Sequence, residues 1–201
     1  MPRKARKISE NGLYHIMIRG NERKEIFKYD EEKKFLAESV IKYLDKQISL
    51  YAICIMNNHA HLAGKFETTE FMTKFMKKIN TRYAGYYNSK GNRVGHVFQD
   101  RYKSEAIVSE RQLLATIRYI HSNPVKANLS ALPWQYPWST CGVYLDMENW
   151  FSPIFIATTP ILDMFSLSKL QAKNLFKDFT IQENDDHFMD QSSEMHIEEQ
   201  D

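Results

Sequence analysis

An α+β fold is predicted by three features of this sequence. Segments that alternate apolar and polar residues are interleaved with segments whose apolar residues recur at helical spacing, in the order β-α-β-β-α-β-α. The 201 residues are 43% hydrophobic and 26% charged, as in an ordinary globular domain. No apolar run approaches the ~18 residues of a membrane-spanning helix. This order and length predict a ferredoxin-like antiparallel sheet with helices packed on one face.

Each predicted element rests on a local pattern. In the first strand, Tyr14, Ile16 and Ile18 fall on one face. The third helix starts at Ser109, a residue type favoured as an N-cap, and should stop before Pro124. The predicted strands are residues 13–19, 48–56, 59–66 and part of 97–108, and the predicted helices are residues 30–47, 69–87, 109–122 and part of 160–181.

Charge is distributed unevenly along the chain. Residues 1–145 contain 24 Lys and Arg against 13 Asp and Glu, whereas residues 146–201 contain 3 against 12. A basic body with an acidic end is typical of nucleic-acid-binding proteins, although a solvated, lysine-rich surface has the same composition. We therefore divide the chain into a basic domain at 1–145, a partly helical extension at 146–181 and an acidic, disordered tail at 182–201.

The two cysteines and the N-terminal residues bear on the cellular compartment of the protein. Cys54 and Cys141 form neither a disulfide framework nor a zinc knuckle. The basic N-terminus has no apolar stretch behind it, so no secretory signal is expected. We therefore predict a cytoplasmic protein with no membrane partner.

The segment His59-Ala60-His61 places two histidines on one predicted strand. Side chains at i and i+2 project from the same face, so the two imidazoles could share one metal ion or one phosphate. A histidine triad hydrolase needs a third histidine at Ala63, and a zincin needs His-Glu-x-x-His, which the sequence lacks. A catalytic divalent ion with open positions and an ordinary hydrogen-bonded pair are both compatible with this segment.

Tyr119 and Asn123 lie one helical turn apart near the end of the predicted third helix, so they share a face. This spacing could place a phenol nucleophile and an amide oxygen over one ion, and amide oxygen suits magnesium or manganese. A tyrosine can form a covalent phosphoester with a DNA strand if a base or a positive charge assists its ionisation. The alternative is a core tyrosine followed by a helix-capping asparagine.

Aromatic residues mixed with Arg and Lys predict a surface for single-stranded DNA. The densest mixture is residues 95–104, and residues 19–23 form a polar turn where the backbone could approach a phosphate. The predicted DNA-binding residues are Arg19, Asn21, Arg23, Arg82, Gln99, Arg101, Tyr102, Lys103 and Arg118.

Together these motifs resemble the single-tyrosine HUH transposases, specifically the REP-associated tyrosine transposase branch, over roughly residues 8–145. Family members often carry proline before the Asn-His pair, where this chain has Asn57; the change should alter the turn but not the ligands. The resemblance rests on Tyr14-His15, Arg19-Gly20-Asn21, Met56-Asn57-Asn58-His59-Ala60-His61-Leu62, Arg82-Tyr83, Tyr87-Asn88, Gly95-His96, Phe98-Gln99-Asp100-Arg101-Tyr102-Lys103-Ser104, Arg118-Tyr119-Ile120-His121-Ser122-Asn123-Pro124-Val125-Lys126-Ala127 and Tyr136-Pro137-Trp138-Ser139.

The resemblance implies a ferredoxin-like core with the histidine pair on a central strand. It further implies metal-dependent cleavage of single-stranded DNA beside hairpins or palindromic repeats, with a 5′-phosphotyrosine linkage and a free 3′-OH as products. By the same resemblance, Tyr119 is the nucleophile, and His59, His61 and Asn123 hold Mg²⁺ or Mn²⁺. A bacterial, nucleoid-associated nickase and strand transferase is therefore expected, and both a monomer and a homodimer are compatible with the sequence.

Two other functions are compatible with the same residues. A non-catalytic DNA-binding protein, such as a domesticated transposase acting as a regulator or architectural protein, would use the same basic body. A metal-dependent phosphodiesterase that uses water would turn over without a protein–DNA adduct.

Overall fold

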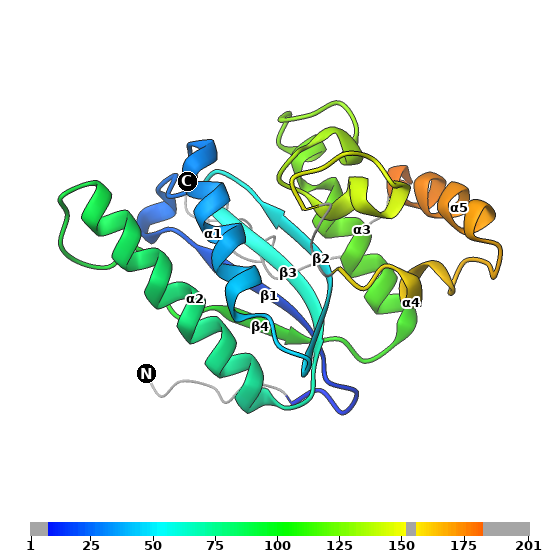
Figure 1. Ribbon diagram of the computed structural model, residues 1–201, viewed down its shortest axis with the longest axis horizontal. Helices are drawn as coiled ribbons and strands as arrows, with labels where there is room; N and C mark the ends of the chain where they lie inside the picture. The colour runs from blue at the N-terminus through cyan, green and yellow to red at the C-terminus, as the bar shows by residue number, and fades with distance from the viewer. Residues whose placement is uncertain (1–7, 152–155, 183–201) are drawn as a thin grey trace, which may run out of the picture.

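The computed structural model describes residues 8–151 and 156–182 (Figure 1). Its four strands form one antiparallel sheet in the order β2-β3-β1-β4, which confirms the predicted ferredoxin-like topology. The acidic tail lies outside the described residues from 183 onward. The elements are β1 (Leu13–Arg19), α1 (Asp30–Tyr43), β2 (Ile48–Ile55), β3 (His59–Phe66), α2 (Thr69–Lys90), β4 (Lys103–Ala106), α3 (Glu110–Lys126), α4 (Thr159–Leu162) and α5 (Lys169–Ile181), with 3-10 turns η1 (Asn21–Arg23), η2 (Pro133–Gln135) and η3 (Thr140–Leu145).

The two central strands, β1 and β3, build the hydrocarbon core on one face of the sheet. They pair along their whole length, and their alternate residues Tyr14, Ile16 and Leu62 are buried beneath α1 and α2. The Tyr14 ring contacts Phe66, which in turn contacts Phe75 of α2. Figure 1 shows α1 and α2 side by side over these strands. Period-two alternation thus directs every second side chain of each strand into this core.

The prediction of helices on one face holds for α1 and α2, whereas α3 covers the opposite face. The Tyr119 ring of α3 contacts the rings of His15 and His61, which alternate along their strands with Ile16 and Leu62. Helix α5 packs in turn on α3, as Figure 1 shows. The sheet is therefore enclosed between two helical layers.

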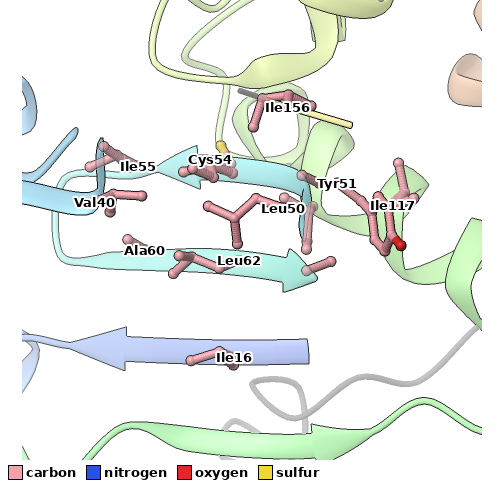
Figure 2. Packing of buried hydrophobic residues seen from close by; sticks show 14 of the residues in the cluster. Ile16, Val40, Leu50, Tyr51, Cys54, Ile55, Ala60, Leu62, Ile117 and Ile156 are labelled. Atoms are coloured by element: carbon pink, nitrogen blue, oxygen red, sulfur yellow. The ribbon is translucent and has the colours of Figure 1, made fainter. Parts of the chain in front are cut away.

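Segments from the C-terminal half cover the outer edge of β2. The Ile53 amide donates to Thr140 Oγ1 at 2.9 Å, and the Ile55 amide donates to the Trp138 carbonyl at 2.9 Å. Figure 2 shows the buried side chains of this region, with Tyr51 of β2 beside Ile117 of α3. These contacts satisfy backbone groups that an exposed edge strand would leave open to a neighbouring chain.

The ends of the helices differ from the predicted ends, most importantly in α3. Pro124 was expected to stop this helix at residue 122, yet α3 continues to Lys126, and the Ala127 amide still donates to the Asn123 carbonyl. Pro124 is buried, and in the last turn it removes only one backbone donor. Asn123 consequently stays helical, on the same face as Tyr119.

Two further helix ends were misplaced. Helix α1 ends at Tyr43 instead of residue 47, because Leu44 adopts an extended conformation. Helix α2 runs to Lys90, three residues beyond the predicted end at 87. None of the described helices is both long enough and apolar enough to span a bilayer.

Candidate active site

Two histidines open strand β3 on the face that α3 covers. His61 is fully buried and His59 is half-buried, and their ring centroids lie 4.8 Å apart with an interplanar angle of 85°. His59 Nδ1 lies 2.5 Å from Oδ1 of Asn58, in the turn that precedes the strand. The two imidazoles therefore lie next to each other, as their i, i+2 spacing on a strand predicts.

Tyr119 reaches this histidine pair from helix α3. Its ring centroid is 5.6 Å from that of His61, at an interplanar angle of 82°, and its side chain is 3% exposed. Nζ of Lys126, two turns further along α3, lies 5.5 Å from the Tyr119 ring centroid. A phenol, two imidazoles and a cation thus meet although they are about 60 residues apart in the sequence.

Asn123 follows Tyr119 by one turn and is 9% exposed. Within the described part of the chain, its Nδ2 atom is buried without a hydrogen-bond partner; this atom is a donor, so only the amide oxygen could bind a cation. Two imidazole nitrogens and one amide oxygen form a donor set compatible with a divalent ion that keeps open positions. No group of three or more His, Cys, Asp or Glu side chains suited to a metal occurs among residues 8–151 and 156–182.

A third histidine, His15, was not among the predicted site residues. It lies on β1 and is 1% exposed; its Nε2 atom is 3.0 Å from Nδ1 of His61. Its ring is stacked on that of His61 at 5.1 Å and meets that of Tyr119 edge-on at 5.9 Å. The alternation that places Tyr14 and Ile16 in the core already puts His15 on the opposite face, and this signal could have identified it.

Cys54 lies directly across the β2–β3 pair from His61. Its thiol is fully buried, and burial, reinforced by the neighbouring Cys141, raises its pKa well above the ordinary value. The thiol therefore stays protonated, whereas a thiolate is the form that binds metals.

The end of β1 brings several predicted DNA-binding residues next to His59. Arg19 faces His59 across the β1–β3 pair, and its carbonyl accepts from the Gln99 amide at 2.9 Å. The Gly20 amide donates to the Asn58 carbonyl at 2.8 Å, and a Cβ at position 20 would collide with the Lys24 carbonyl. The polar turn, the turn before His59 and the 95–104 segment are therefore tied together.

The 95–104 segment also borders an open groove of about 710 Å³ on the side of α2. Lys77 and Asn80 of α2 line one wall, and Gln99 and Arg101 line the other. Arg23, Gln99, Arg101 and Lys103 are exposed, so their side chains can meet a ligand. Six of the nine predicted DNA-binding residues thus lie around the end of β1 or at the start of β4: Arg19, Asn21, Arg23, Gln99, Arg101 and Lys103.

The other three predicted DNA-binding residues take part in packing between elements. Arg82 donates from Nε to Ser39 Oγ at 3.1 Å and lies over the Phe35 ring, between α2 and α1. Tyr102 is 7% exposed, with its hydroxyl 3.0 Å from that of Thr73. Arg118 lies over the Phe179 ring of α5. These contacts place the three side chains between packed elements.

The sequence matches the family model described as IS200-like transposase over residues 9–123, which is more than half of the chain. The chain belongs to the IS200-like transposase family. The matched segment runs from just before β1 to Asn123, so it includes the three histidines and Tyr119. Membership of the IS200-like transposases places this protein among proteins that process DNA.

Two solved structures are similar to this IS200-like transposase. A REP-associated tyrosine transposase bound to a REP hairpin matches with a TM-score of 0.61 and 18% identity, over 72% of this chain and 86% of that one. A protein of Deinococcus radiodurans R1, named as a transposase, matches with a TM-score of 0.40 and 17% identity, over 61% and 97% of the two chains. The first likeness supports the fold. No curated protein matches the sequence significantly.

Proposed function

We propose that this IS200-like transposase is a metal-dependent nickase and strand transferase that acts on single-stranded DNA beside hairpins. The observation that carries the proposal is the contact of the Tyr119 ring with the rings of His61 and His15, with His59 beside His61, within one chain. A phenol beside a pair of imidazoles combines a nucleophile with ligands for an ion that can bind its phosphate target.

In the proposed reaction, the Tyr119 hydroxyl oxygen attacks the scissile phosphorus, and the bond from phosphorus to the 3′ oxygen breaks. The phenol loses its proton and the departing 3′ oxygen gains one, which leaves a 5′-phosphotyrosine linkage and a free 3′-OH. A 3′-OH can later attack the same phosphorus and release Tyr119. Because one phosphoester replaces another at each step, rejoining requires no ATP.

His59, His61 and Asn123 would hold Mg²⁺ or Mn²⁺ through one nitrogen of each imidazole and the amide oxygen. Such an ion polarises the phosphoryl oxygen and stabilises charge that develops in the transition state. Lys126, whose Nζ lies 5.5 Å from the Tyr119 ring centroid, supplies positive charge beside the phenol as it ionises.

The polar and cationic residues around the end of β1 would hold the DNA strand. Arg19 faces His59 across the β1–β3 pair, the Asn21 amide donates to the Val97 carbonyl, and Arg101 lines the neighbouring groove. The guanidinium groups of Arg19 and Arg101 would attract phosphates, and that attraction is weakened by salt. The REP hairpin in the similar tyrosine transposase structure supports a hairpin or palindromic DNA as the ligand.

The test is covalent capture of DNA. The full-length protein is incubated with a hairpin oligonucleotide that carries single-stranded flanks, with Mg²⁺, with Mn²⁺ or with EDTA, and the products are resolved on a denaturing gel. We expect a protein–DNA adduct only when an ion is present, and none with Tyr119→Phe, whose DNA affinity should stay within about twofold of wild type because only the attacking oxygen is lost. Tyr43→Phe, on α1, is the matched control and should retain the adduct.

Three results would contradict the proposal. An adduct formed by Tyr119→Phe would show that Tyr119 is not the nucleophile. Hairpin binding without any cleavage by the wild-type protein would favour a non-catalytic DNA-binding protein. Cleavage without an adduct would favour a phosphodiesterase that uses water.

A further inference from the structure

His15 is the histidine of the Tyr14-His15 motif, and the proposed reaction leaves it without a role. Its side chain is 1% exposed on the face of β1 opposite Tyr14 and Ile16, and its Nε2 atom is 3.0 Å from Nδ1 of His61. The two rings are stacked, with centroids 5.1 Å apart and an interplanar angle of 30°. This separation is that of a hydrogen bond between two buried imidazoles.

The hydrogen bond can be made in two ways, which differ in whether Nε2 of a neutral His61 ring carries a lone pair or a proton. If His61 donates from Nδ1 to His15, a neutral His61 ring keeps the lone pair of Nε2 for a metal. If His15 donates instead, the proton of a neutral His61 ring is on Nε2, and that nitrogen cannot bind an ion. A partner at the distal nitrogen commonly sets both the tautomer and the ring orientation of a histidine ligand.

We propose that His15 is a positioning residue that accepts a hydrogen bond from Nδ1 of His61 and thereby presents Nε2 of His61 to the metal. The inference rests on the proposed function, because it takes His61 as a ligand. His15 is not itself a third ligand in this arrangement, because its Nε2 atom is directed at His61 and not at a centre shared with His59.

The surroundings of His15 support a role in holding the site together. Its ring also meets the Tyr119 ring edge-on at 5.9 Å, so one side chain of β1 contacts both the proposed ligand and the proposed nucleophile. Glu105 of β4 faces His15 across the β1–β4 pair, on the same side of the sheet. His15 therefore links the central strands to α3 at the point where the reacting groups must be aligned.

The first test measures Mn²⁺ binding to the full-length protein by electron paramagnetic resonance, with no DNA present. His15→Leu removes the acceptor at similar volume, and we expect Mn²⁺ affinity to fall by about 10–100-fold, the usual cost of losing the partner of a ligating histidine. His15→Gln, whose amide oxygen can accept from Nδ1 of His61, should recover most of that loss. His121→Gln is the matched control, because His121 is a fully buried histidine bonded to Thr140, with its ring against Tyr144 and Phe176; it should bind Mn²⁺ like the wild type.

The second test reads the His61 tautomer in the metal-free wild-type protein from imidazole nitrogen-15 chemical shifts. We expect the proton on Nδ1, and a proton on Nε2 would overturn the proposal even if His15→Leu failed to fold. Unchanged Mn²⁺ affinity in a folded His15→Leu variant, alongside lost affinity in His61→Ala, would overturn the role of His15 while leaving the metal site intact. A wild-type protein that binds no Mn²⁺ would overturn both proposals.

Discussion

The two faces of the β1–β3 pair differ in what the same two strands bury. On the face toward α1 and α2, Ile16 and Leu62 are buried among hydrocarbon side chains. On the face toward α3, the adjacent residues His15 and His61 are equally buried, but against each other and against the Tyr119 ring. Strand alternation therefore lets one pair of strands stabilise the fold on one side and assemble polar groups on the other. The degree of burial does not separate these roles, whereas the chemistry of the burying partners does.

His121 of α3 provides a comparison within the histidines. It is fully buried like His61, but its ring lies among Tyr144 and Phe176, and its one described hydrogen bond is to the Thr140 hydroxyl. Burial lowers the pKa of His121 to about 3, so this imidazole stays neutral. A buried histidine with a single polar partner in an aromatic cluster is structural. His61, in contrast, contacts the imidazole of His15 on β1 and the phenol of Tyr119 on α3.

The largest effect on metal binding is expected on the face of the sheet toward α3, which carries His15, His59 and His61. His59→Ala removes a proposed ligand, so Mn²⁺ affinity should fall by more than about 100-fold and the DNA adduct should disappear. This loss is larger than the loss expected for His15→Leu, which removes only the hydrogen-bond partner of a ligand. The free energy of unfolding should change by about 1 kcal/mol or less, because His59 is only half-buried. Isothermal calorimetry with Mn²⁺ and urea unfolding measure the two quantities.

Lys65→Ala serves as the control for that variant, since Lys65 is an exposed residue further along the same face of β3. It should leave both metal binding and the adduct unchanged. If His59→Ala bound Mn²⁺ as well as the wild type, His59 would not be a ligand.

The opposite face should give the opposite result. Leu62→Ala leaves a cavity in the core beneath α1 and α2, and the free energy of unfolding should fall by about 2–5 kcal/mol, as is usual for such truncations. Below the melting transition, Mn²⁺ affinity should remain within about twofold of wild type, because the side chain points away from His61. Urea unfolding and calorimetry on the same preparation check this, and a selective loss of metal affinity with unchanged stability would refute the division between the faces.

Much of the fold follows from local pattern, and the errors have local causes. Strand β3 has the predicted bounds, His59–Phe66, because it starts directly after the turn at Asn57 and Asn58. The end of α3 was misplaced because the rule that proline stops a helix neglects packing, and Pro124 is buried in a helix that continues past it. The position of α3 opposite to α1 and α2 depends on tertiary packing that no local spacing contains.

The candidate site was predictable in pieces. Spacing alone puts His59 beside His61 and Asn123 one turn after Tyr119, but only strand pairing and the docking of α3 bring these two pieces together. Alternation along β1 already puts His15 on the face opposite Tyr14 and Ile16, whereas its proximity to His61 exists only once β1 pairs with β3. The roles of these residues remain predictions.

The predicted DNA-binding set shows the limit of reading residue type along a sequence. Arg101 lies at an exposed groove wall, whereas Arg82, from an equally basic and aromatic segment, bonds to Ser39 and covers Phe35 between two helices. An arginine beside tyrosines looks the same in the sequence whether its guanidinium faces solvent or an interior aromatic ring. The cluster at the end of β1 is therefore the surface that we propose for DNA contact.

The smallest effect should come from Lys126, at the end of α3, the helix that covers His15 and His61. Because its ammonium lies over the Tyr119 ring, Lys126→Gln removes positive charge beside the ionising phenol, and adduct formation should slow by about 10-fold, equivalent to roughly 1.4 kcal/mol. Lys126→Arg should retain most of the rate. Lys177→Gln is the control, since Lys177 lies over the Trp134 ring in a comparable pair that involves neither Tyr119 nor the histidines. If single-turnover rates fell equally in Lys126→Gln and Lys177→Gln, the loss would come from general surface charge and not from Lys126 at the phenol. Only a cation held beside the Tyr119 hydroxyl can assist its ionisation.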